Sequence, residues 1–195
     1  MKNTIIFLFS LTSILFFLSC NRQLPTEFHF SNGGETAYHI RTGTLLNGEK
    51  SLVTASVNGL VQAFTVEGDP IWKAATDGAF PFDMCLADID KDGMDEVLVS
   101  SGNGTLYSFD DNGELLWKFS AILPLYRVSV AGKEDGTPVI FTGGPEKKLF
   151  AISAKGELIQ SIQTEDCIRH IRSGNMMNDG KEYIAMTTTS SGLSG

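Results

Sequence analysis

A repeat of turn glycines constrains the fold of this chain more than any other feature of its sequence. The glycines stand at intervals of 45, 43 and 44 residues, and each follows Asn or Asp and precedes a short apolar run; they are Gly48, Gly93, Gly136 and Gly180. A second landmark keeps the same step, since Asn58-Gly59 corresponds to Asn103-Gly104 in the next repeat. Such a period predicts stacked copies of one supersecondary unit, because each unit hides its apolar faces only against its neighbours.

Turn signals within each repeat indicate short antiparallel strands. Asn-Gly and Asp-Asn-Gly sequences lie between alternating apolar runs, and tight hairpin turns need the positive φ angles that Gly and Asn adopt most readily. No segment carries a sustained helical period. We therefore predict an all-β chain of β-propeller blades, each with four antiparallel strands. The predicted blades cover about residues 37–78, 79–122, 123–165 and, incompletely, 166–195.

Two segments of the second repeat resemble known propeller families. Residues 87–99, with the sequence Ala-Asp-Ile-Asp-Lys-Asp-Gly-Met-Asp-Glu-Val-Leu-Val, resemble an FG-GAP/VCBS repeat, and residues 104–117 resemble a quinoprotein-type (PQQ-like) blade. The resemblance implies a propeller but little about function, because propellers host unrelated activities. Propellers of these families usually close with six to eight blades, so we expect this chain to be a fragment, with residues 27–30 as an outer strand of the final blade.

The first 20 residues have the pattern of a bacterial export signal. A positively charged start precedes an apolar run that is shorter than a membrane-spanning helix and ends at Cys20. Residues 17–20, Phe-Leu-Ser-Cys, resemble a lipobox, which implies that Cys20 is acylated and anchors the protein to a membrane of the bacterial cell envelope, periplasmic or outer-membrane. Ordinary secretion with an unmodified Cys20 is the alternative. Residues 21–35 form a predicted polar tether, and the partial propeller occupies residues 36–195.

The composition limits the partners that the chain can bind. Its formal net charge is −8 at pH 7, and 42% of its residues are hydrophobic. Nucleic acid is excluded as a partner, because neutralising phosphates needs a basic face. Cys85 and Cys167 could pair in an oxidising compartment, or they could remain as two small apolar side chains in the core.

An acidic loop in the second repeat is the strongest candidate metal site. Its spacing, Asp-x-Asp-x-Asp-Gly-x-x-Glu, places oxygen ligands at positions 1, 3, 5, 7 and 9 around a turn glycine, an arrangement that suits Ca²⁺. The predicted ligands are Asp88, Asp90, Asp92, the carbonyl oxygen of Met94, and Glu96. Asp95 is expected to face solvent. A plain Asx turn with solvated carboxylates is the alternative, but four acidic groups this close repel one another without a cation, so we predict one structural Ca²⁺.

Basic side chains recur on the predicted innermost strands. The matching triplets are His39-Ile40-Arg41, Met84-Cys85-Leu86, Arg127-Val128-Ser129 and His170-Ile171-Arg172. Strand alternation puts the first and third residues of a triplet on one face, and that face lines the central channel of a propeller. An anionic ligand such as an acidic sugar is the predicted partner of His39, Arg41, Arg127, His170 and Arg172. The alternative is that these side chains pair with surrounding carboxylates.

Trp72 and Trp117 stand at matching positions of the first two repeats. We interpret them as packing residues between blades, because an indole offers a large apolar surface. An exposed indole would instead be a platform for a sugar ring.

Two functions are compatible with these features. The favoured hypothesis is a lipid-anchored, non-catalytic propeller that binds a glycan or a protein partner and carries one Ca²⁺-binding loop. The alternative is the N-terminal half of a propeller-type polysaccharide lyase or hydrolase that acts on an acidic polysaccharide. Against catalysis, the sequence shows no nucleophile-base pair, no zinc cluster and no phosphate loop. A quinoprotein dehydrogenase is less favoured, since relatives with that cofactor often carry adjacent cysteines.

Overall fold

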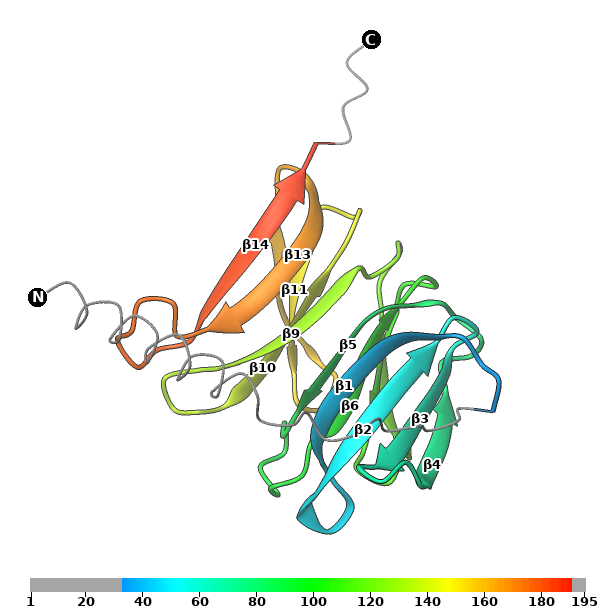
Figure 1. Ribbon diagram of the computed structural model, residues 1–195. Coiled ribbons are helices and arrows are strands. Elements are labelled where there is room, and N and C mark those ends of the chain that lie inside the picture. The colour runs from blue at the N-terminus through cyan, green and yellow to red at the C-terminus, as the bar shows by residue number, and fades with distance from the viewer. Residues whose placement is uncertain (1–32, 191–195) are drawn as a thin grey trace, which may run out of the picture.

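The computed structural model describes residues 33–190, which form three four-stranded sheets and one two-stranded sheet (Figure 1). The first sheet contains β1 (Ala37–Leu45), β2 (Glu49–Ser56), β3 (Leu60–Thr65) and β4 (Pro70–Ala75), and the 3-10 turn η1 (Leu46–Gly48) joins β1 to β2. The second contains β5 (Pro81–Ala87), β6 (Glu96–Ser101), β7 (Thr105–Phe109) and β8 (Leu115–Ser120). The third contains β9 (Arg127–Gly132), β10 (Pro138–Gly143), β11 (Lys148–Ser153) and β12 (Leu158–Gln163). The fourth pairs β13 (Cys167–Gly174) with β14 (Tyr183–Thr189).

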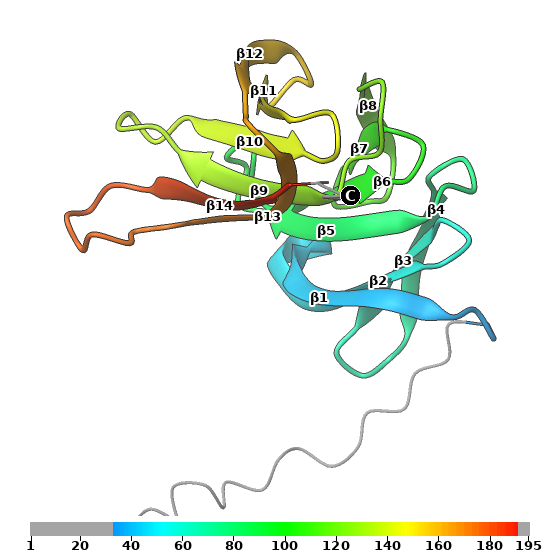
Figure 2. The same cartoon turned by 90° about the horizontal axis from the view of Figure 1, so that it is seen from above.

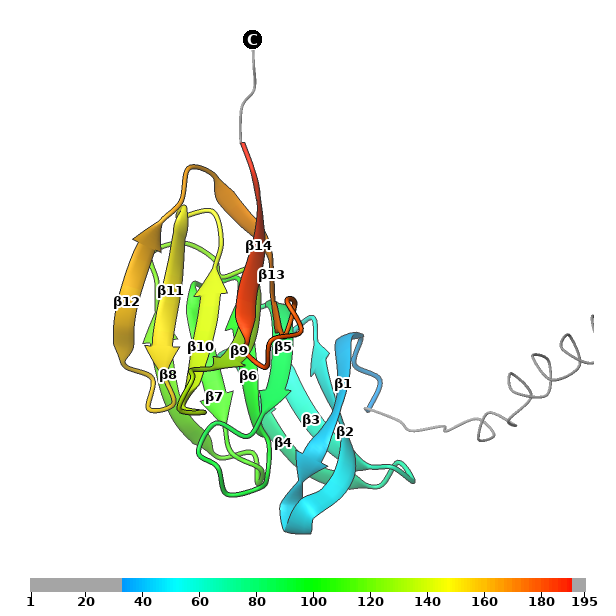
Figure 3. The same ribbon diagram turned by 90° about the vertical axis from the view of Figure 1, so that its left-hand side faces the viewer.

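Each four-stranded sheet is an antiparallel meander in which spatial order follows chain order. The first strands of successive sheets lie side by side, β1 next to β5, β5 next to β9, and β9 next to β13 (Figure 2). The last strand of each complete sheet lies at the outer edge, opposite the first strand, as β12 does in Figure 3. This is the arrangement of propeller blades around an axis, so the predicted all-β class and four-stranded antiparallel blades are confirmed.

The hydrophobic core lies between the blades. One cluster joins the first and second blades and includes Val53, Ala63, Val99 and Tyr107. A second joins the second and third blades and includes Leu98, Leu106, Ile140 and Ile152, and a third reaches the fourth blade through Ile168 and Ile171. The middle strands β6 and β7 are buried along their whole length, because both faces of the blade are covered by neighbours.

The two tryptophans each join one blade to the next. The indole N–H of Trp72 donates to the carbonyl oxygen of Asp111 at 2.8 Å, and that of Trp117 donates to the carbonyl oxygen of Ala154 at 2.8 Å. Each ring lies on a turn glycine of the following blade: a Cβ on Gly113 would be 2.5 Å from Trp72, and one on Gly156 would be 2.7 Å from Trp117. Trp72 and Trp117 therefore pack between blades, as the sequence predicted.

Several N-terminal predictions fall outside the described residues. They are the signal peptide, Cys20, residues 21–32 of the tether, and the outer strand at residues 27–30. Within residues 33–190, no helix has the length and apolar character needed to cross a membrane.

The two remaining cysteines are both free thiols. Cys167 is buried at the start of β13, and Cys85 is partly buried on β5. Burial raises the pKa of the Cys85 thiol to about 11, so this side chain is protonated at neutral pH. They are therefore two separate, largely apolar side chains rather than a disulfide.

Candidate functional site

The strand pairing corrects the alignment of the innermost strands. Four residues stand opposite equivalent positions of the second strands, namely His39, Asp83, Arg127 and His170, which face Ala55, Ser100, Gly143 and Thr187. In the second blade the matching triplet is thus Asp83-Met84-Cys85, one residue earlier than predicted. Counting back from the turn glycine fails there because the β5–β6 connection spans residues 88–95, whereas the β1–β2 connection spans only residues 46–48.

Asp83 is a channel-side carboxylate that the sequence reasoning missed. It is 4% exposed, and its Oδ1 accepts a hydrogen bond from Nη2 of Arg41 at 3.2 Å. Its Oδ2 lies 3.4 Å from the backbone N–H of Val128 in the third blade. Arg41 also donates from Nε to the carbonyl oxygen of Met84 at 3.1 Å. Arg41 and Asp83 therefore link three blades. For Arg41, this is the alternative given above, in which a basic side chain of the channel pairs with a carboxylate.

Four of the five predicted ligand-binding residues line two cavities on the inner strands. Arg127 and His170 line a cavity of about 540 Å³, whose other lining residues are Tyr38, Phe82, Tyr126, Arg169, Thr187 and Thr189. Arg41 and Arg172 line a second cavity of about 400 Å³ together with Asp83. His39 lines neither, and burial lowers the pKa of its half-buried imidazole, so it is neutral at pH 7.

The first cavity, which we call the rim cavity, holds cations without carboxylate partners. Nη1 of Arg127 donates to the carbonyl oxygen of Phe82 at 3.2 Å, and its Nε to Nδ1 of His170 at 3.3 Å. The Arg169 guanidinium lies 5.5 Å from the ring centroid of Tyr126, and its Nε donates to Oγ1 of Thr189 at 2.8 Å. Among the described residues, no carboxylate pairs with either arginine. The cavity is therefore locally positive in an acidic chain.

The acidic loop connects β5 to β6 and brings three of its carboxylates together. Single oxygens of Asp88, Asp90 and Glu96 lie within 4.8 Å of one another. Asp92 is not part of that group, and its Oδ1 accepts the backbone N–H of Met94 at 2.8 Å. Asp88 accepts backbone N–H groups from Lys91 at 2.6 Å and Gly93 at 3.0 Å. The loop thus has Asx-type hydrogen bonds as well as a carboxylate cluster.

Glu96 is the buried member of this cluster, at 2% exposure. Burial first, and then the negative charges of Asp90, Asp92 and Asp88, together raise its pKa to about 7, although the N–H of Ile89 donates to Oε2 at 2.8 Å and acts in the opposite direction. The prediction that Asp95 faces solvent is wrong: its Oδ2 accepts the backbone N–H of Thr44 at 2.7 Å and ties the loop to the first blade. Burial and mutual repulsion therefore disfavour a fully ionised cluster unless a cation neutralises it.

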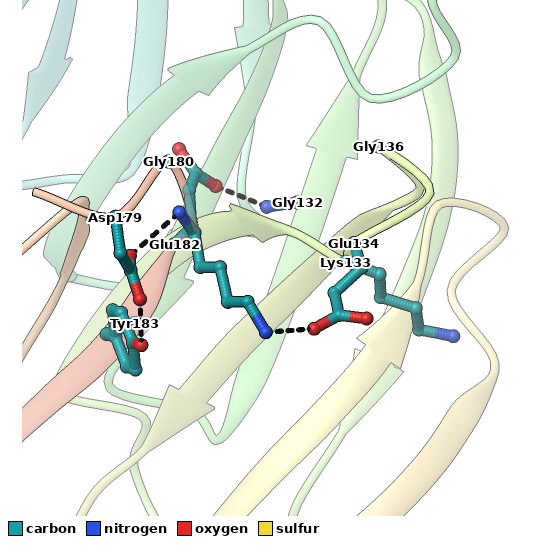
Figure 4. Close-up of a pocket in the computed structure, with 9 residues that line it drawn as sticks. Gly132, Lys133, Glu134, Gly136, Asp179, Gly180, Glu182 and Tyr183 are labelled. Carbon is teal, nitrogen blue, oxygen red and sulfur yellow. Dashed lines mark hydrogen bonds and ion pairs between the residues drawn. The ribbon is translucent and has the colours of Figure 1, made fainter. Parts of the chain in front are cut away.

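A larger cavity of about 830 Å³ lies between the hairpin loops of the third and fourth blades (Figure 4). Most of its charged side chains have partners within the chain: Lys181 pairs with Glu134, Glu182 accepts the backbone N–H of Gly132, and the Tyr183 hydroxyl donates to Asp179 at 2.6 Å. This cavity joins two hairpins and leaves few groups to hold a ligand.

The chain resembles proteins that act on one polysaccharide. Residues 51–189 match the family described as the lambda-carrageenase β-propeller domain. A lambda-carrageenase of a Pseudoalteromonas species is 33% identical over 130 residues, and that of Pseudoalteromonas carrageenovora is 32% identical over 130 residues. Each alignment covers 66% of this chain and 14% of the relative. The chain thus corresponds to a small part of these relatives.

Solved structures with a similar fold are more distant in sequence. The WD40 domain of Neurospora crassa Pan2 superposes with a TM-score of 0.60 at 19% identity, covering 84% of this chain and 47% of that one. A structure of BBS1N in complex with ARL6DN gives a TM-score of 0.65 at 13% identity, covering 81% of this chain and 50% of that one. At these identities the likeness shows the fold alone, which is a propeller.

Proposed function

This chain belongs to the lambda-carrageenase β-propeller domain family, and from that membership we propose that it forms part of the propeller of a polysaccharide-degrading enzyme. The proposal replaces the favoured hypothesis of a non-catalytic module with its alternative, a lyase or hydrolase that acts on an acidic polysaccharide. The observation that carries it is the match over residues 51–189.

The rim cavity supplies the groups that such a substrate needs. λ-Carrageenan is a sulfated polysaccharide, so its binding requires cations that are free to meet anionic groups. Arg169 and His170 are exposed, and the guanidinium of Arg127 lies beside them without a carboxylate partner among the described residues. A guanidinium offers a planar set of N–H donors that suits oxyanions. We propose that these three side chains hold sulfate groups of the polysaccharide.

The described channel residues are assigned to binding rather than to bond cleavage. Most glycoside hydrolases use two carboxyl groups on either side of the scissile bond. Among the residues that line the two channel-side cavities, Asp83 is the one carboxylate, and it is buried and paired with Arg41. Asp83 is therefore a structural group in this proposal.

The proposal predicts that the purified protein binds λ-carrageenan and that Arg169→Gln weakens the binding. We expect a loss of about 3- to 5-fold at low salt, because one exposed charge contact is removed, and a smaller loss at high salt, because salt screens exposed charges. Affinity electrophoresis in gels containing λ-carrageenan measures both. The product of the full open reading frame, incubated with the same polysaccharide, is expected to release new reducing ends.

Lys155→Gln is the matched control for this experiment, because it removes the same charge from an exposed turn after β11, away from the rim cavity. It is expected to change the affinity less than twofold. Equal retardation of both variants, or equal binding of neutral agarose, would show that the protein has no specific site for an anionic polysaccharide at the rim.

We also propose that the acidic loop binds one Ca²⁺ as a structural ion. Support comes from the clustered oxygens of Asp88, Asp90 and Glu96 and from the burial of Glu96, which leaves its charge poorly solvated. Oxygen ligands of this kind suit Ca²⁺. Bound calcium would hold the β5–β6 connection, and through Asp95 its contact with Thr44.

Calcium is therefore expected to raise the melting temperature of the protein, and Asp90→Asn is expected to abolish that rise, because it removes one charged ligand from the cluster. Calorimetric titration with CaCl₂ and thermal melts measure binding and stabilisation. Asp110→Asn is the control, since Asp110 makes the same kind of turn, accepting N–H groups from Asn112 and Glu114, outside any such cluster. If the unmodified protein shows neither heat of binding nor a thermal shift, the loop does not bind Ca²⁺ and is a plain Asx turn.

The location of the protein stays a proposal. The export signal and the acylation of Cys20 fall outside the described residues. An envelope-anchored protein would meet extracellular polysaccharide directly, which agrees with the proposed substrate class.

A further inference from the structure

A β-bulge recurs at the start of the innermost strand. The pairing of β1 with β2 shifts between Ala37 and His39, that of β5 with β6 between Pro81 and Asp83, and that of β13 with β14 between Ile168 and His170. The extra residues are Tyr38, Phe82 and Arg169. In the third blade Tyr126 holds the matching place, directly before Arg127. A bulge re-aims the side chain of its extra residue, so three blades direct one residue each to this level, and Tyr126 of the third blade lines the same cavity without a bulge; we call these four residues the bulge row.

The bulge row forms a continuous surface across all four blades. Ring centroids are 4.7 Å apart for Tyr38 and Phe80, 5.2 Å for Phe80 and Phe82, and 4.9 Å for Phe82 and Tyr126. The Arg169 guanidinium continues the row over Tyr126. All four bulge-row residues line the rim cavity, where Thr187 and Thr189 add hydroxyl groups.

Packing alone does not account for this surface. Tyr38 is 55% exposed, and Phe82 and Tyr126 are partly exposed, although the interior of each blade offers fully buried positions. Exposed aromatic rings beside hydroxyls and cations match the three kinds of surface on a sulfated sugar: the apolar C–H face, the ring hydroxyls and the sulfate group.

We propose that the bulge row is the subsite that contacts the sugar rings of a sulfated polysaccharide. Tyr38 and Phe82 pack against the C–H face of a pyranose ring, and Arg169, held by Tyr126 and Thr189, meets its sulfate group. The inference rests on the proposed function and adds to it the residues that recognise the sugar itself rather than its charge.

The test compares Tyr38→Ala and Phe82→Leu with Arg169→Gln in titrations with λ-carrageenan at about 0.05 M and about 0.5 M NaCl, which change the screening length severalfold. Tyr38→Ala is expected to lower the affinity by about 3- to 10-fold at both salt concentrations, because apolar packing on an aromatic ring is not screened. Phe82→Leu keeps an apolar side chain in the blade and removes only the ring. Tyr183→Ala, on β14 in the 830 Å³ cavity, is the aromatic control and is expected to bind as the unmodified protein does.

Two outcomes separate the inference from the function on which it rests. If Tyr38→Ala and Phe82→Leu bind normally while Arg169→Gln binds weakly, the bulge row is not a sugar subsite and the proposed function stands. If the unmodified protein fails to bind λ-carrageenan, the proposed function is wrong and the inference is wrong with it. Melting curves of all variants check folding, and the exposure of Tyr38 makes unfolding of its variant unexpected.

Discussion

Trp117→Ala is expected to lower the free energy of unfolding by about 2–4 kcal/mol, somewhat less than for a fully buried tryptophan because the side chain is partly exposed. The indole covers Gly156 of the next blade and donates to the carbonyl oxygen of Ala154. Alanine would remove both contacts and open a gap between the second and third blades. Urea denaturation followed by circular dichroism measures the change.

Three further variants separate the parts of this contact. Trp117→Phe keeps a ring but loses the N–H donor, so its expected cost is about 1 kcal/mol. Gly156→Ala keeps the indole but places a Cβ 2.7 Å from it, at a position with a φ of 81°, and is expected to destabilise as well. Leu116→Ala, on the same strand and 49% exposed, is the control with an expected change within about 0.5 kcal/mol. A similar loss for Leu116→Ala and Trp117→Ala would mean that the indole does not join the blades.

The repeat made the architecture predictable because the turn residues recur at matching positions of the blades. Asn58-Gly59 and Asn103-Gly104 both join strands 2 and 3 of a blade, and both glycines have positive φ. The packing role of Trp72 and Trp117 also follows from the period, since residues at corresponding positions of similar blades contact corresponding neighbours. The resemblance to FG-GAP/VCBS and quinoprotein-type repeats led to the same propeller fold, whereas the family that matches is the lambda-carrageenase type.

The candidate site was less predictable because it depends on register rather than on period. The bulges place Tyr38 and Phe82 at the rim, and bulges have no simple sequence signal. Loop lengths also vary between blades, which hid Asp83 from the alignment. Asp95 was misplaced for a related reason: its partner Thr44 lies in another blade, so only the three-dimensional packing reveals the contact.

Asp83→Ala is expected to destabilise the protein by about 2–3 kcal/mol, because it leaves a channel-side guanidinium and a backbone donor without their acceptor. The loss is limited because the Arg41 side chain is 41% exposed and can turn to water, whereas the carboxylate is 6% exposed. A double-mutant cycle with Arg41→Ala isolates the pair, and Asp83→Asn tests the charge while keeping an acceptor oxygen. A coupling near zero would mean that the Arg41–Asp83 pair adds no stability beyond the contact of Arg41 with the Met84 carbonyl. A clear coupling would show that the pair stabilises the packing of the first blade on the second. Among the described inner strands, the second blade would then carry a stabilising carboxylate at the position that His39, Arg127 and His170 occupy in the other three.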